Sequence, residues 1–235
     1  MIKLNISVGK SRWDKNWKNK IMTWKEMVDR LAKTTRTHET VAEYKAMNKD
    51  DQGRIKDIGG FVGGHLENGQ RLKGNVKNRS LVTLDVDYAG QDFWDNFTLI
   101  NDYAAALYST HKHTPKSPRL RLIIPLKRPV TPEQYEAIAR RIADDINIEL
   151  FDDTTYQPSR LMYWPSTPKD GVYLFKVQEG PILDPQEILD TYDDWSDCSY
   201  WPESSRSKQK RKSLKDKQED PLTKKGVIGA FCRTY

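Results

Sequence analysis

Two aspartates alternate with apolar residues in one short segment, residues 81–88, which has the pattern of a buried strand. The segment reads Leu-Val-Thr-Leu-Asp-Val-Asp-Tyr. Because successive side chains of a strand point to opposite faces, the apolar face is expected to pack on helices while Asp85 and Asp87 share the other. Two such carboxylates, about 7 Å apart along the strand, repel each other unless a cation lies between them. Their hard oxygen atoms would suit Mg²⁺ or Mn²⁺. The alternative is that the segment is a solvent-facing strand and the two aspartates are ordinary surface charges.

Composition indicates a folded protein whose net charge is concentrated in one segment. The 235 residues are 37% hydrophobic and include seven Trp and eleven Tyr, enough for one core and a small second unit. Within residues 204–217, seven Lys or Arg residues stand against one Asp and account for the whole formal net charge of +6. This segment is expected either to contact nucleic-acid phosphates or to serve as a soluble linker.

The chain carries no signal for membrane insertion or export. No apolar run approaches the length of a membrane span, and the N-terminal residues lack the apolar core of a signal peptide. Two distant cysteines, Cys198 and Cys232, form no metal-binding or disulfide pattern. We therefore expect a soluble protein of a reducing intracellular compartment, without a membrane partner.

Strands and helices are mixed along the chain, and some have clear boundary signals. Thr23 with Glu26, and Thr131 with Gln134, form capping boxes that predict the starts of two helices. The glycine-rich segment 59–64 allows close approach of the backbone either to a ligand or to another strand. This mixture indicates an α+β domain with a mixed α/β sheet. Further predicted strands cover residues 2–8, 103–111, 119–126, 160–164 and 172–178, and further helices residues 91–101 and part of 181–195.

The composition changes twice near the C-terminus, which predicts the domain boundaries. Residues 1–195 are expected to form one folded domain, followed by a basic polar linker over 196–220 without hydrophobic periodicity. Residues 221–235 become apolar again and are too few to fold alone. We expect them to begin a truncated C-terminal helical domain.

Groups that bind phosphate are predicted on the same sheet face as the two aspartates. If the hairpin strands pair beside residues 81–88, Ser109 and His111 share a face of one strand and Arg119 and Arg121 a face of the other. Acids beside such groups suit nucleotidyl transfer, in which two metal ions stabilise the attacking and leaving oxygens. A third carboxylate would complete the site, and both Asp152 and Asp153 are candidates. Lys112 and Arg160 are further candidates to bind phosphate.

Three short motifs occur in an order that resembles the archaeo-eukaryotic primase superfamily. They are the Asp-x-Asp motif at Asp85, Ser109-Thr110-His111, and Phe151-Asp152. Residues 157–166, together with the strand that carries Arg119 and Arg121, are similar to the primase-polymerase domain of phage and mobile-element replication proteins. The resemblance implies a primase-polymerase fold, with an RRM-like or ferredoxin-like catalytic sheet and an N-terminal α/β unit.

The resemblance also implies a role for each matching residue. The catalytic metal ligands of a two-metal Mg²⁺ or Mn²⁺ site would be Asp85, Asp87 and Asp152, with Asp153 as the alternative third ligand. Ser109 and His111 would hold the incoming triphosphate, and Arg160 would neutralise it. Face geometry adds three residues to the nucleotide-binding set: Arg119, Arg121 and Lys112.

The implied function is a metal-dependent nucleotidyltransferase, a DNA primase or DNA-directed polymerase. It would synthesise primers or extend DNA from NTPs or dNTPs on a single-stranded DNA template, in the cytoplasm of a bacterial host, with a helicase domain following in the full-length protein. One alternative is a Rep-type (HUH) nickase, because His111-Lys112-His113 resembles its metal motif and Tyr135 lies on a predicted helix. The other is a non-catalytic module that binds replication origins.

Overall fold

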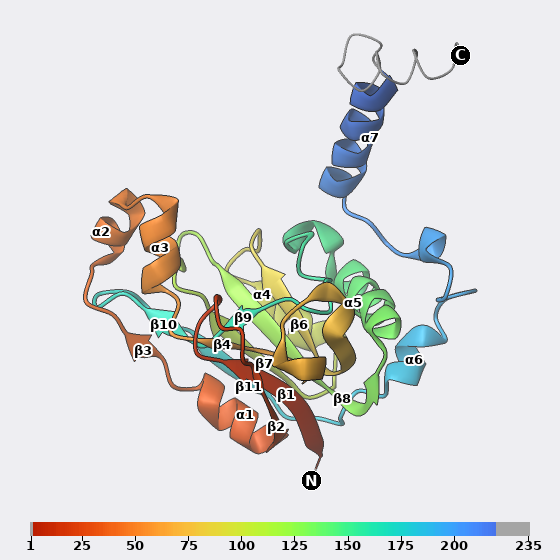
Figure 1. Ribbon diagram of the computed structural model, residues 1–235, viewed down its shortest axis with the longest axis horizontal. Helices are drawn as coiled ribbons and strands as arrows, with labels where there is room; N and C mark the ends of the chain where they lie inside the picture. Colours follow the sequence, from red (N-terminus) through yellow and green to blue (C-terminus); the bar gives the residue numbers. More distant parts are fainter. Residues whose placement is uncertain (1, 220–235) are drawn as a thin grey trace.

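A five-stranded antiparallel sheet forms the centre of the fold. The computed structural model describes residues 2–219 (Figure 1), so the expected start of a further domain at 221–235 lies outside the described residues. The strand order is β11-β7-β8-β6-β5. The bounds are β5 Gly64–Leu66, β6 Val76–Val86, β7 Ala105–Ser109, β8 Leu120–Val130 and β11 Phe175–Gln178.

The middle of this sheet has a ferredoxin-like chain order. Strand β6 is followed by α4 (Phe93–Ile100), the hairpin β7–β8 and α5 (Pro132–Ile146). After α5, an antiparallel bridge between Phe151 and Val86 brings the chain back beside β6. The order is therefore β-α-β-β-α-β, with the last strand reduced to one bridge. The predicted α+β class and ferredoxin-like sheet are confirmed.

The N-terminal unit contains a second sheet that needs residues from much later in the chain. Its order is β2-β1-β4-β9, all antiparallel. Strand β9 comes after the third predicted motif. Strand β10, which follows β9, pairs in parallel with β3 in a separate two-stranded sheet. The predicted N-terminal α/β unit exists, but it is not contiguous in sequence. The bounds are β1 Lys3–Gly9, β2 Lys18–Thr23, β3 Thr35–Arg36, β4 Gly60–Val62, β9 Met162–Tyr163 and β10 Ser166–Thr167, with α1 Trp24–Leu31, α2 Val41–Ala46 and α3 Lys49–Ile55.

Both faces of the central sheet are covered along most of β6. Val82, Leu84 and Val86 pack into a core with α4 and α5. On the opposite face, Leu81 packs with Tyr108 and residues of the N-terminal unit. The second face is therefore closed at the start of β6 and carries polar groups towards the end, where Asp85 follows.

The glycine-rich segment approaches other strands. A Cβ on Gly64 would overlap the carbonyl oxygen of Asn78 on β6, and a Cβ on Gly60 would overlap that of Met162 on β9. Of the two interpretations of residues 59–64, close strand packing is the one observed.

A helix lies in the segment expected to be a basic polar linker. This helix, α7 (Ser205–Glu219), covers most of residues 196–220. Its Lys, Arg and Gln residues favour a helix without supplying an apolar stripe, so hydrophobic periodicity could not reveal it.

No helix in residues 2–219 combines the length and apolar character needed to cross a membrane. The other short helices are α6 Pro185–Leu189 and the 3₁₀ turns Glu67–Gly69, Lys73–Asn75, Ile148–Leu150 and Cys198–Tyr200.

Strand packing at the glycine segment can be tested with two alanine substitutions. Gly64→Ala should destabilise the protein by about 1–3 kcal/mol, because the new methyl group forces β5 away from β6. Gly74→Ala is the matched control, since a Cβ there meets no atom within 4 Å. Urea unfolding followed by tryptophan fluorescence measures both. Equal stabilities for the two variants would contradict the close packing.

Candidate active site

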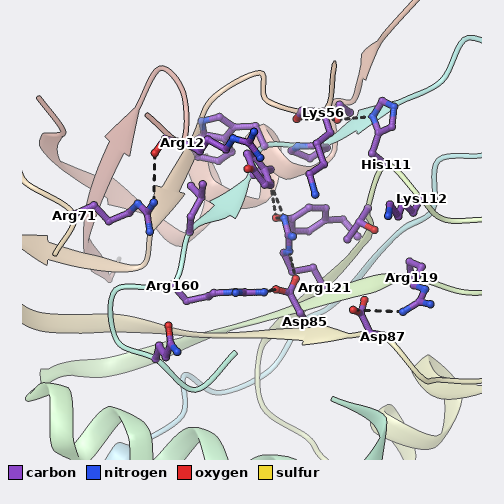
Figure 2. A pocket seen from close by; sticks show the side chains of 18 residues that line it. Arg12, Lys56, Arg71, Asp85, Asp87, His111, Lys112, Arg119, Arg121 and Arg160 are labelled. Atoms are coloured by element: carbon purple, nitrogen blue, oxygen red, sulfur yellow. Dashed lines mark hydrogen bonds and ion pairs between the residues drawn. The ribbon is translucent and has the colours of Figure 1, made fainter. Parts of the chain in front are cut away.

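A cavity of about 510 Å³ lies between the central sheet and the N-terminal unit, at the acidic end of β6 (Figure 2). Two carboxylates line it, those of Asp85 and Asp87. Positively charged side chains outnumber them and suit a polyanionic ligand. They are Arg12, Lys56, Arg71, Lys112, Arg119, Arg121 and Arg160.

Asp85 is buried and has a cationic partner at each carboxylate oxygen. The register of β6 and β8 places it opposite Arg121, whose Nε donates to Oδ1 at 2.6 Å. Arg160 donates to Oδ2 through Nη2 at 3.1 Å. Burial alone would raise the pKa of Asp85, but the charges of Arg121 and Arg160 outweigh it and hold the pKa below its ordinary value. Asp85 is therefore ionised and firmly held.

Asp87 is more accessible and less well neutralised. Its partner is Arg119, with Nη1 3.4 Å from Oδ2, and both side chains are about one-third exposed. Burial and then the charge of Asp85 raise the pKa of Asp87 above its ordinary value. Asp85, Asp87, Arg119 and Arg121 share one cavity, as the strand alternation predicts.

The structure separates the two candidates for a third carboxylate. Arg160 Nη2 donates to Asp152 Oδ2 at 2.9 Å, so one guanidinium joins Asp152 to Asp85. Asp153 instead accepts a hydrogen bond from Ser204 Oγ at 2.5 Å. Asp152 is thus the one brought beside the Asp-x-Asp pair.

The expectation that Ser109 shares the face of His111 is wrong. Ser109 is fully buried, and its Oγ accepts a hydrogen bond from the Leu174 amide at 2.9 Å. It does not line the cavity, whereas its neighbour Tyr108 does. Strand β7 ends at Ser109, so the alternation of faces does not continue to His111 in the following turn.

His111 lines the cavity and is fixed through both ring nitrogens. Nε2 lies 2.8 Å from Glu39 Oε1, and Nδ1 lies 2.8 Å from Ser166 Oγ. Burial lowers the pKa of His111 despite the bond to Glu39, so the contact is a hydrogen bond of a neutral ring at pH 7. Two residues that the motifs do not include, Glu39 and Ser166, therefore orient this side chain.

Several cavity residues carry no local sequence signal. Lys56 follows α3, and burial, reinforced by the charges of Arg121 and Lys112, lowers its pKa. Arg12 and Arg71 also belong to segments far from the three motifs. Only the packing of the N-terminal unit against the central sheet brings these cations to the aspartates.

The donor set fits a divalent cation only in part. Asp85 and Asp87 offer the hard oxygen ligands that Mg²⁺ and Mn²⁺ prefer. The pKa of Asp87 is raised by burial and then by the charge of Asp85, and a cation between the two would relieve that repulsion. Within residues 2–219, however, no three His, Cys, Asp or Glu side chains are grouped to hold a metal. Arg160 lies between Asp85 and Asp152 and keeps the third carboxylate apart.

The ion pairs predict different consequences for the two aspartates. Asp85→Ala should destabilise the protein by about 3–5 kcal/mol, because Arg121 would remain buried without its carboxylate. Asp87→Ala should change stability by less than about 1 kcal/mol, since its ion pair is partly exposed. Urea unfolding compares them, with Asp85→Ala/Arg121→Met expected to recover much of the loss. An unchanged stability of Asp85→Ala would refute the structural role of this pair.

Comparisons with known proteins assign the chain to a family. No curated protein matches it. Among solved structures, it is similar to the AEP domain of the primase-polymerase of cyanophage S-2L, with 14% identity, 80% of this chain and 88% of the other covered, and a TM-score of 0.43. The assignment rests on the family match, which spans residues 2–204 and confirms the predicted kinship with phage and mobile-element replication proteins. The chain belongs to the VapE N-terminal domain family.

Proposed function

We propose that this domain is a metal-dependent nucleotidyltransferase that synthesises primers or extends DNA on a single-stranded template. The observation that carries the proposal is the cavity itself. Two carboxylates, one near the end of β6 and one directly after it, lie among seven cationic side chains that line the same cavity. A nucleoside triphosphate is a ligand whose phosphates match the cations and whose bound metal would match the carboxylates.

Each group has a distinct part in the proposed reaction. Arg12, Lys56 and Lys112 would bind the triphosphate. Arg119, which pairs with the Asp87 carboxylate in the free protein, would pair with a phosphate instead when the nucleotide binds. Asp85 and Asp87 would hold Mg²⁺ or Mn²⁺, which supplies charge stabilisation at the attacking and leaving oxygens when bound. Arg121 would act as a positioning residue, because its contacts are to Asp85, Tyr108 and the Tyr163 carbonyl.

Arg160 would make metal binding depend on the nucleotide. In the structure its guanidinium supplies the positive charge between Asp85 and Asp152. An incoming triphosphate offers Arg160 a more highly charged partner, and both carboxylates would then be available to the metal. Asp152 would complete the ligand set in that state.

The substrates and partners follow from the same proposal. The incoming nucleotide would be an NTP or a dNTP, the template single-stranded DNA, and a helicase domain would follow in the full-length protein. The nickase alternative has little support, because the Tyr135 side chain is fully buried and its hydroxyl donates to the Thr83 carbonyl. A non-catalytic DNA-binding module would gain nothing from the two carboxylates, which repel phosphate in the absence of a cation.

Nucleotide incorporation tests the proposal most directly. Asp87→Asn should reduce incorporation of labelled nucleotide by about 100-fold or more, the scale expected when a group that stabilises developing charge is lost. Asp87 is preferred over Asp85 because its replacement spares the buried ion pair. The assay uses primed and unprimed single-stranded DNA, NTPs and dNTPs, and each metal. Asp184→Asn, at a surface pair with Lys127, is the control. Normal incorporation by Asp87→Asn would exclude the proposed function.

Metal binding without nucleotide tests the role of Arg160. Arg160→Ala should bind Mn²⁺ roughly tenfold more tightly than the native chain, because the competing cation is gone, and should bind a triphosphate more weakly. Electron paramagnetic resonance of free Mn²⁺ measures the first effect independently of catalysis. Arg160→Lys retains the charge and should stay close to the native affinity. A native Mn²⁺ affinity in Arg160→Ala would show that Arg160 does not block the site.

A further inference from the structure

An exposed tyrosine outside the cavity lies close to two arginines. The Tyr88 side chain, 55% exposed, directly follows Asp87 in sequence. The guanidinium carbon of Arg119, a cavity residue, is 5.8 Å from the centre of its ring, and that of Arg206 is 4.4 Å from it. The ring is therefore the link between the cavity and the beginning of α7.

The beginning of α7 is attached to the segment that carries the third predicted motif. Arg206 donates to the carbonyl oxygens of Glu149 and Phe151, at 3.0 and 2.9 Å. The Ser204 hydroxyl donates to Asp153. These contacts hold the first turn of α7 beside Asp152 and explain why Asp153 faces away from the cavity.

From this attachment α7 extends away from the rest of the protein and carries positive charge with it (Figure 1). Its first seven residues, 205–211, contain four cations and no acid. Lys208 and Lys210 are exposed. A cationic path thus begins at Arg119, passes Tyr88 and continues along the first two turns of α7.

We propose that single-stranded nucleic acid follows this path, with a base stacked on Tyr88 and a phosphate bound by Lys210, which lies four residues after Arg206 and therefore on the same face of α7. Exposed aromatic rings beside cationic groups are the combination by which proteins hold single strands without reading their sequence. An acidic protein surface would use Lys210 but would not require the flat ring. The inference deepens the proposed function, since it names the route of the nucleic acid outside the nucleotide cavity.

Binding of a labelled oligothymidylate, measured by fluorescence anisotropy without nucleotide or metal, tests the path. Tyr88→Ala should weaken binding roughly tenfold or more, whereas Tyr88→Phe should retain it because the stacking face remains. Lys210→Gln should reduce the slope of log affinity against log salt by about 0.7, the value for one single-strand phosphate contact.

The matched control is Lys208→Gln, which removes an exposed lysine two residues away, on nearly the opposite face of α7. Its slope and affinity should equal those of the native chain. Equal losses in Lys208→Gln and Lys210→Gln, or an equal loss in Tyr88→Phe and Tyr88→Ala, would overturn the proposal. So would tighter binding of duplex DNA that depends on Lys210 but not on Tyr88. Because the assay needs no incorporation, absence of polymerase activity would reject the proposed function while leaving this result readable.

Discussion

The buried ion pair between Asp85 and Arg121 is the interaction on which the arrangement of the site depends. It joins β6 to β8 at the edge of the covered face, and Arg121 also donates to the Tyr163 carbonyl in the N-terminal unit. One charged pair therefore connects the central sheet to the part of the protein that supplies Lys56 and Arg12. Two charges removed from water are tolerated there because each has several polar partners.

The same constraint explains the imbalance of charge in the cavity. Asp85 is neutralised within the protein, so most of the remaining cations have no carboxylate close by and face the empty volume. Asp87 lies at the boundary between these environments, partly paired and partly accessible. The chain outside the basic segment has no net charge. The positive field of the cavity therefore arises because the fold gathers cationic side chains there, not because the domain has an excess of them.

Sequence patterns predicted the features that depend on neighbouring residues. Strand alternation identified the shared face of Asp85, Asp87 and Arg121, and capping boxes located the starts of α1 and α5. The prediction that Ser109 and His111 share a face failed, because β7 ends at Ser109 and the alternating pattern does not reveal where a strand ends. Lys56 could not be predicted, since only tertiary packing brings it to the site. The helix at Ser205–Glu219 escaped detection because helix propensity acts there without an amphipathic pattern.

The dispersed N-terminal sheet has a consequence for synthesis of the protein on the ribosome. Strand β9 pairs with β4, and β10 with β3, across about a hundred residues or more of intervening chain. A nascent chain cannot complete these two pairings until residue 167 has left the exit tunnel, and such distant pairings form slowly. The walls of the cavity are therefore completed late in synthesis, because Tyr163, Trp164 and Ser166 line it beside residues made much earlier.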